Sequence, residues 1–316
     1  MKELIAQPVV SVCIPMYNAS RYIEQALNSI LQQTYKRIEI IVVDDHSSDQ
    51  SLEVAKRYTS LGVKVVVNPK KGACAARNYA FQQSTGQFIK FMDADDLCDI
   101  ALIERQVSAI VHRSDFTLAF SPLSMLFPDG EVVRPQRSID RDFQPGIDLQ
   151  AEIWKFGGFN CPHCYLMHRE LAEQAGGWDE TLLKNQDAEY YSRVLALADC
   201  AVSVATARVI WRQTNVGISS QTNQEAVRSM AESLIKIARV LLSSSSSDDI
   251  SGICGRYVGL FVFKNYPAIK PVLPRIIDAM RELNVELVLP DRRLLGVLRP
   301  IVGWKIAATV MNKYGL

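Results

Sequence analysis

The strongest constraint on the fold is a regular alternation of strand-like and helix-like segments in the first 95 residues. Short runs of β-branched and other apolar residues are each followed by apolar residues at helical spacing. The predicted strands are residues 9–14, 38–43, 63–67 and 88–92, and the predicted helices between them are residues 23–31, 51–58 and 73–83. This order predicts a doubly wound, mostly parallel α/β sheet flanked by helices.

The rest of the chain divides into a mixed part and a helical part. Helices are predicted at residues 99–111, 168–175 and 185–197, a strand at 201–211, and short strands with turns between 116 and 145. From residue 224 the pattern is helical, and the serines at 243–247 indicate a flexible connection. We therefore predict one unit at residues 1–223 and a helical C-terminal region at residues 224–316.

The composition of the chain restricts the molecules that it can be expected to bind. Lys and Arg number 35 against 34 Asp and Glu, so the net charge of +1 gives no field that attracts polyanions, and nucleic-acid binding is not expected. Seven scattered cysteines favour a reducing, cytoplasmic compartment. Cys161 and Cys164 have the spacing of half a zinc site, but only His163 and His168 lie close, so we expect neither structural zinc nor redox chemistry.

Membrane contact is considered at both ends of the chain. Residues 1–8 contain no apolar signal-peptide core, and no run of about 18 uncharged apolar residues predicts a transmembrane helix. Residues 294–316 are largely apolar but carry Arg299, Lys305 and Lys313, which suits a basic helix on the inner face of an anionic membrane. We favour a helix packed on its own domain and keep peripheral membrane contact as the alternative.

Polar side chains follow three predicted strands where the strands end, at residues 15–18, 44–47 and 93–96. In doubly wound sheets, ligands bind beyond the carboxyl ends of the strands. Asp93 and Asp95 can point to one side of an extended chain, and paired carboxylates suit Mg²⁺ or Mn²⁺ on a diphosphate. The alternative is a solvated loop, since Asp-x-Asp is common by chance.

Two further groups could contact a nucleotide. A carboxylate of Asp44 or Asp45 can accept a hydrogen bond from a base or a ribose, and capping of a helix at residues 47–48 is the alternative role for this stretch. Residues 72–78 begin a helix with small side chains, where Arg77 can supply a fixed cation to a phosphate. Neither GxGxxG nor GxxxxGK[ST] is present, which argues against dinucleotide and P-loop sites.

Together these stretches resemble family 2 glycosyltransferases of the GT-A fold. The resemblance extends to about residue 220, roughly two-thirds of the chain, and fades beyond it. Its specificity comes from several blocks in the family's order: residues 12–18, 29–34, 39–49, 72–78, 91–96, 176–180 and 185–190.

The resemblance implies a role for each matching residue. In the family's pattern the following line the nucleotide pocket: Pro15, Tyr17, Asn18, Asp44, Asp45, Arg77, Asp93, Ala94 and Arg212. Asp45 would contact the base with Asp44 in support, and Asp93 and Asp95 would hold Mn²⁺ or Mg²⁺ on the diphosphate. Asp187 falls where the family has the general base that deprotonates an acceptor hydroxyl, and transfer would invert the anomeric carbon.

The chain departs from the family pattern at two positions. His46 stands where many members have Gly, and Thr214 stands where many have a His near the diphosphate. The processive Gln-x-x-Arg-Trp stretch is absent, so transfer of a single sugar is expected rather than polymer synthesis.

The sequence thus predicts a metal-dependent, inverting glycosyltransferase of the hexosyltransferase type. Its expected donor is a nucleotide-diphospho-sugar, and its acceptor is a saccharide or glycolipid in polysaccharide or glycolipid assembly. The alternatives are a catalytically degenerate nucleotide-sugar-binding protein and a sugar nucleotidyltransferase, although the second would need a Gly-rich basic loop after the first strand. Candidates for stacking on a sugar, with core packing as the favoured role for most, are Trp154, Phe156, Phe159, His163 and Trp178.

Overall fold

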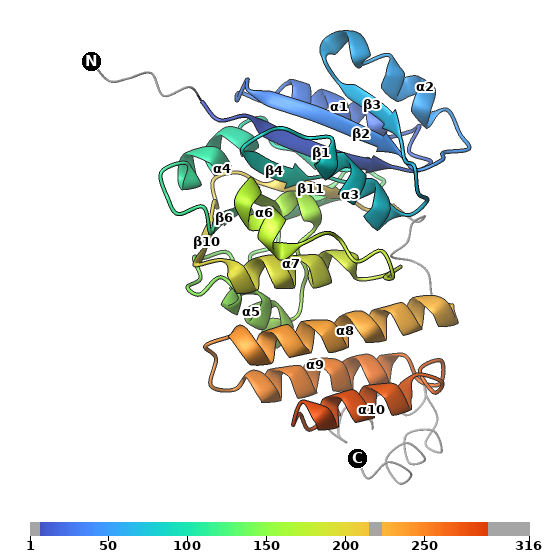
Figure 1. The fold of residues 1–316 in the computed structure, drawn as a ribbon, viewed down its shortest axis with the longest axis vertical. Helices are drawn as coiled ribbons and strands as arrows, with labels where there is room; N and C mark the ends of the chain where they lie inside the picture. The colour runs from blue at the N-terminus through green and yellow to red at the C-terminus, as the bar shows by residue number, and fades with distance from the viewer. Residues whose placement is uncertain (1–6, 215–222, 290–316) are drawn as a thin grey trace.

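The computed structural model of the chain describes residues 7–214 and 223–289, and its centre is a seven-stranded sheet (Figure 1). The strands, in spatial order, are β10 (Cys200–Ser203), β6 (Thr117–Phe120), β9 (Tyr165–His168), β4 (Phe88–Phe91), β1 (Val10–Met16), β2 (Ile38–Asp44) and β3 (Lys64–Val67). Neighbours pair in parallel except at β9, which runs antiparallel to both β4 and β6. The predicted mostly parallel α/β fold is confirmed.

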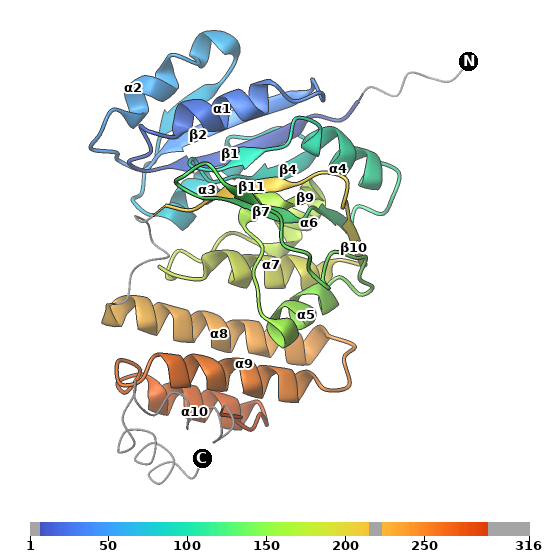
Figure 2. The same cartoon turned by 180° about the vertical axis from the view of Figure 1, so that it is seen from behind.

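Helices cover both faces of this sheet. The first three are α1 (Ile23–Leu31), α2 (Ser51–Lys56) and α3 (Ala73–Gln82), and α4 (Leu102–Ile110), α6 (Arg169–Ala175) and α7 (Gln186–Leu197) follow. In Figure 1, α3 and α6 lie in front of the sheet, whereas Figure 2 shows α1 on the opposite face. The buried side of α1 consists of Ile23, Ala26, Leu27 and Ile30, which is the helical spacing expected from the sequence.

A second, four-stranded sheet borders the first. It contains β5 (Leu97–Cys98), β11 (Val209–Arg212), β7 (Leu123–Leu126) and β8 (Val132–Val133). The single strand predicted at 201–211 is therefore wrong, because it is two strands in different sheets. The chain turns at residues 204–208, where the backbone N–H of Val204 bonds to the Phe120 carbonyl (2.7 Å) and that of Arg208 bonds to the Asp99 carboxylate (2.8 Å).

The end of one strand differs from the prediction, and one helix lies where the sequence made no prediction. Strand β1 continues through Pro15 to Met16, because its register with β4 ends at Cys13 and the missing N–H of proline costs little beyond that point. Helix α5 (Asp148–Phe156) lies in a stretch for which no helix was predicted, and its buried Trp154 stacks on Tyr257 with ring centroids 4.5 Å apart.

The described part of the C-terminal region, residues 223–289, is helical, as predicted, and contains α8 (Gln224–Ser244), α9 (Ile250–Lys264) and α10 (Leu273–Glu282). These helices form a stack beside α7 and α5 (Figure 1). The serine run is attached to α5, because the Ser245 hydroxyl and the Ser246 backbone N–H both bond to the Asp148 carboxylate, at 2.7 and 3.1 Å; its flexibility stays a prediction. The division at residues 223 and 224 into two separate units stays a prediction.

Residues 294–316, considered for membrane contact, lie outside the described part of the chain. Within residues 7–214 and 223–289, no helix combines the length and the apolar character that crossing a membrane requires.

The first departure from the family pattern has a backbone explanation. His46 follows β2 and has φ = +62°, a left-handed conformation that glycine adopts without steric cost. Its side chain is exposed, so burial does not compensate for this conformation.

We expect His46→Gly to keep or raise the free energy of unfolding, by up to about 1 kcal/mol, because glycine relieves the strained φ. The β-branched His46→Val should lower it by about 1–3 kcal/mol. Urea unfolding measures both, with His46→Asn as the control, since Asn tolerates this conformation. Equal stability of the Gly and Val variants would contradict the explanation.

Candidate active site

The ends of β4, β1 and β2 lie side by side, which brings the three polar clusters to one edge of the sheet. Hydrogen bonds join two of the clusters directly. The backbone N–H of Asp45 donates to the Met16 carbonyl (2.7 Å), the N–H of Asn18 to the Ser47 hydroxyl (3.0 Å), and the N–H of Ser48 to the Asn18 side chain (2.8 Å). The strand ends therefore lie together, as the predicted topology requires, and a ligand site at this edge stays a prediction.

The two acids after β2 differ in their partners. One carboxylate oxygen of Asp45 accepts from the Gly72 backbone N–H (2.8 Å) and from the Asn68 side chain (2.7 Å), so Asp45 holds the start of α3. Asp44 accepts from the Ser47 N–H at 3.3 Å through one oxygen, while its other oxygen is buried without a hydrogen-bond partner among the described residues. A buried acceptor without a partner is costly, and a donor on a ligand would satisfy it.

Arg77 connects three parts of the site. Its guanidinium donates to Asp93 (2.7 Å) and to the side-chain oxygen of Gln186 (3.0 Å), and it lies 4.5 Å from the ring of Trp178. Only 6% of Arg77 is exposed. Trp178 in turn stacks on Tyr190 of α7 at 4.3 Å. Gln186 and Trp178 as partners of Arg77 were not predicted, because no local spacing relates residues about 100 positions apart.

Asp93 and Asp95 place two carboxylates in one loop, with the buried Ala94 between them. The Asp93 side chain is 30% exposed and paired with Arg77, whereas no described residue forms an ion pair or a side-chain hydrogen bond with the Asp95 carboxylate. Loss of water, together with the nearby charge of Asp93, raises the pKa of Asp95 to about 6. Among the described residues, no group of three or more His, Cys, Asp or Glu side chains is placed to hold a metal ion.

Arg212 supports this loop through the backbone. Its backbone N–H donates to the buried carboxylate of Asp96 (2.8 Å), and its guanidinium donates to the Asp95 carbonyl (2.8 Å) and to the side chain of Gln25 (2.7 Å). The other Asp96 oxygen lies 3.4 Å from the His163 ring, and burial lowers the pKa of His163 to about 3. Arg212 therefore fixes the position of the carboxylates.

Asp187 lies in the first turn of α7 and is partly exposed. Loss of water around the carboxylate raises its pKa to about 6; the charge of Arg77 opposes this shift and that of Asp93 adds to it. The three side chains are therefore close enough to interact electrostatically. A carboxyl group with a pKa near 6 is ionised at neutral pH and can accept a proton.

The remaining predicted residues line the edge of the same region or the core. Tyr17 is 54% exposed with the Lys71 ammonium 6.0 Å from its ring, and Pro15 is partly buried at the end of β1. Of the side chains weighed for sugar stacking, Trp154, His163 and Trp178 are buried in the core, whereas Phe156 and Phe159 are exposed. Thr214 follows β11 at the border of the described residues.

Comparison with known protein families identifies the chain. The sequence profile of glycosyl transferase family 2 matches residues 11–176, which is more than half of this chain. The chain belongs to glycosyl transferase family 2. The resemblance inferred from the sequence blocks is thereby confirmed.

Two named bacterial glycosyltransferases are similar to part of the chain. The chain is 33% identical over 127 residues to the putative teichuronic acid biosynthesis glycosyltransferase TuaG of Bacillus subtilis, covering 39% of this chain and 50% of TuaG. It is 29% identical over 154 residues to the Escherichia coli UDP-Glc:alpha-D-GlcNAc-diphosphoundecaprenol beta-1,3-glucosyltransferase WfgD, covering 48% and 58%. The chain therefore spans 50–58% of the length of these two relatives.

Two solved glycosyltransferase structures share the fold. Staphylococcus aureus TarS, residues 1–349 in complex with UDP-GlcNAc, superimposes with a TM-score of 0.71 over 97% of this chain and 89% of TarS, at 21% identity. The mannosyltransferase PcManGT of Pyrobaculum calidifontis, in complex with GDP-Man and Mn²⁺, gives 0.59 over 98% and 85%, at 18% identity. The predicted GT-A-like architecture with a helical C-terminal region is confirmed by these likenesses.

The position of Arg77 leads to a stability prediction. Arg77→Met keeps an apolar stem beside Trp178 but leaves Gln186 and Asp93 without their partner, so we expect the free energy of unfolding to fall by about 1–3 kcal/mol. Urea unfolding measures the loss.

The matched control is Arg256→Met, since the Arg256–Asp249 ion pair has side chains 50% and 63% exposed and should contribute less than about 1 kcal/mol. The proposed central position of Arg77 would be refuted by equal stability of the two variants.

Proposed function

We propose that the chain is a metal-dependent, inverting glycosyltransferase that moves a single sugar from a nucleotide-diphospho-sugar to a hydroxyl acceptor. The observation that carries this proposal is the position of the buried Arg77 guanidinium, which bonds to Asp93 (2.7 Å) and to Gln186 (3.0 Å). Asp95 lies in the same loop as Asp93, and Asp187 follows Gln186 in α7. Such a site combines groups that suit a diphosphate with a carboxylate able to take a proton.

The residues suit a divalent cation whose coordination is completed by the substrate. Loss of water raises the pKa of Asp95, the nearby charge of Asp93 adds to this shift, and a cation would relieve the repulsion between the two carboxylates. Two carboxylates, with no third protein ligand among the described residues, suit Mg²⁺ or Mn²⁺, which takes its other ligands from phosphate oxygens and water. When bound, the ion neutralises charge on the departing diphosphate. Arg77 holds the Asp93 carboxylate in place, and Arg212 holds the loop.

Asp187 is proposed as the general base. A sugar hydroxyl has a high pKa, so its proton must pass to a positioned carboxylate as the oxygen attacks. The oxygen forms its bond to the anomeric carbon on the side opposite the diphosphate, whose bond to that carbon breaks, and the configuration inverts. Arg77 keeps an opposite charge beside Asp187 and favours its ionised form at neutral pH.

Relatives suggest the class of substrates. WfgD is described as using UDP-glucose on a diphosphoundecaprenol-linked sugar, and the solved neighbours bind UDP-GlcNAc or GDP-Man. We propose a nucleotide-sugar donor of this kind and a saccharide or glycolipid acceptor in polysaccharide or glycolipid assembly.

Asp44, one of whose oxygens has no hydrogen-bond partner among the described residues, is proposed to accept a hydrogen bond from the nucleotide, beside Asp45 and the exposed Tyr17. The location proposed is cytoplasmic, peripheral at the inner face of the membrane if residues 294–316 bind it.

A catalytically degenerate nucleotide-sugar-binding protein is the main rival, and a sugar nucleotidyltransferase is the second. The assay that separates them incubates the protein with UDP-glucose, UDP-GlcNAc or GDP-mannose and Mn²⁺ without an acceptor. Slow release of one nucleoside diphosphate supports the transferase and names its donor. Binding without release would favour the degenerate protein.

Two substitutions separate metal binding from proton transfer. Asp95→Ala and Asp187→Ala should each lower transfer at least about 100-fold, because a cation ligand and the base are lost respectively. Asp95→Ala should also weaken binding of the nucleoside diphosphate with Mn²⁺, whereas Asp187→Ala should leave its Kd within about twofold. Calorimetry and a transfer assay measure these effects, and full activity of Asp187→Ala would rule out its role as base.

Removal of metal is a separate test. The site is acidic and the whole chain is nearly neutral, so a diphosphate should bind only when a cation inverts the local field. We expect excess EDTA to weaken binding of UDP or GDP at least about tenfold, and Mn²⁺ in excess over EDTA to restore it. Equal affinity with and without chelator would refute the metal requirement.

A further inference from the structure

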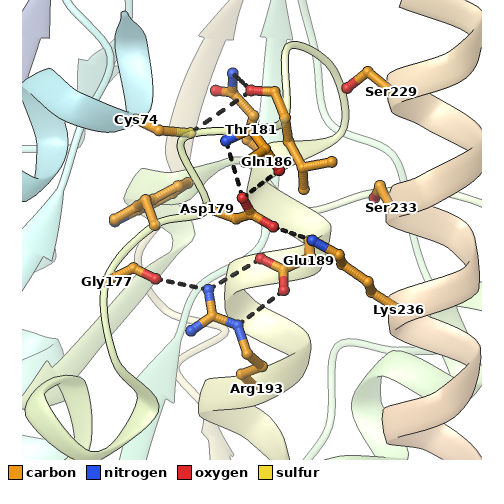
Figure 3. A network of polar contacts seen from close by, with 12 residues as sticks. Cys74, Gly177, Asp179, Thr181, Gln186, Glu189, Arg193, Ser229, Ser233 and Lys236 are labelled. Atoms are coloured by element: carbon orange, nitrogen blue, oxygen red, sulfur yellow. Dashed lines mark hydrogen bonds and ion pairs between the residues drawn. The ribbon is translucent and has the colours of Figure 1, made fainter.

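Helix α8 carries polar side chains on a face that is otherwise apolar. Ser229 and Ser233 are 7% and 0% exposed, and they are four residues apart, so they lie one turn above the other on the same face. Lys236 follows three residues later. Figure 3 shows these three side chains directed from α8 toward the loop before α7. Buried hydroxyls on a packing face require hydrogen-bond partners, and here those partners lie in the loop before α7.

The two serines bind three consecutive residues of that loop. The Ser229 hydroxyl accepts from the backbone N–H groups of Leu183 (2.8 Å) and Lys184 (2.9 Å). The Ser233 hydroxyl accepts from the Asn185 side chain (2.7 Å) and donates to the Asn185 carbonyl (3.1 Å). Two side chains of α8 thus fix both the backbone and the last side chain before α7 begins.

The loop needs this external support. Asn185 is the N-cap residue of α7 but has φ = +59°, and its side chain forms no cap hydrogen bond within the helix. Asn adopts the left-handed conformation at little cost, but without a side-chain cap the helix itself does not hold Asn185, and the bonds to Ser233 do. The next two residues are Gln186, which accepts from Arg77 (3.0 Å), and Asp187. Any shift of the loop therefore moves both residues.

Lys236 provides a second attachment. It forms an ion pair with Asp179, which also accepts from the Thr181 backbone N–H (2.9 Å). Burial of Asp179 acts to raise its pKa, but the hydrogen bonds from Lys236 and Thr181 outweigh this effect and lower the pKa to about 2. The preceding residue is Trp178, which lies over Arg77. Helix α8 therefore holds two of the three segments that border the Arg77 guanidinium, namely those of Trp178 and Gln186.

We infer that Ser229 and Ser233 of α8 are positioning residues for the reaction, which set the first turn of α7 so that Asp187 faces the acceptor hydroxyl and Gln186 meets Arg77. The inference rests on the proposed function of Asp187. It makes the C-terminal helices a part of the acceptor side of the site, whereas the donor side is built on the strand ends. Loss of the serines should therefore impair turnover and leave nucleotide binding intact.

The test uses the full chain with Ser229→Ala and Ser233→Ala combined. We expect kcat, for the nucleotide-sugar that the wild type uses, to fall about 10–100-fold, because a displacement near 1 Å can cost this much. The Kd of UDP or GDP with Mn²⁺ should stay within about twofold. Hydrogen–deuterium exchange of residues 179–190 should become faster. Ser229→Thr, which keeps the hydroxyl, should retain more of the activity than Ser229→Ala.

A matched control separates positioning from general stability. Ser192 lies in α7, is 0% exposed, and its hydroxyl donates only within its own helix, to the Glu189 carbonyl at 2.7 Å. Ser192→Ala removes a buried hydroxyl of the same kind and should leave kcat and the exchange of residues 179–190 within about twofold of the wild type.

Two results would overturn the inference. One is an unchanged kcat in the double serine variant. The other is a decrease in the kcat of Ser192→Ala that is as large as the decrease in the double serine variant. Failure of the proposed function looks different, since the wild type would then release no nucleoside diphosphate from any of the three donors. In that case unchanged exchange of residues 179–190 in the double variant would still refute the coupling between α8 and this loop.

Discussion

The buried guanidinium of Arg77 is the interaction on which the rest of the site depends. It is contributed by α3, and it bonds to Asp93 after β4 and to Gln186 at the start of α7. Because a guanidinium offers donors in a fixed planar fork, these bonds also fix the angle between the segments they join. Burying the guanidinium without hydrogen-bond partners would cost too much free energy. The fold must therefore keep Asp93 and Gln186 in place as partners of this charge.

The same residue explains how an acidic site fits in an almost neutral protein. Asp93, Asp95 and Asp187 share a small region, and the pKa of the latter two is raised because water is partly excluded. Arg77 compensates part of this charge. Because negative charge remains uncompensated, we expect a cation and a diphosphate to bind together, since each lowers the free-energy cost of binding the other.

Sequence periodicity was sufficient for the parallel half of the sheet, where strands and helices alternate and each pattern is local. The strand ends, and hence Asp44, Asp45, Asp93 and Asp95, follow from that topology. The parts that could not be predicted depend on distant contacts. The short strand β9 has no periodic signal beyond its four residues, and the partners of Arg77 lie about 100 positions away. Ser229 and Ser233 looked like ordinary helix residues because their role depends on the loop that α8 meets.

Strand β9 also has a consequence for the order in which the fold can assemble. Strands β1, β2 and β3, with the helices between them, come from one continuous stretch and pair in chain order. Strands β4 and β9 close much longer stretches, since Val10 pairs with Phe88 and Phe88 pairs with His168. Closing such long loops is slow. We therefore expect β1, β2 and β3 to pair early, and α7 and α8 to be joined to them only when β4 and β9 have paired.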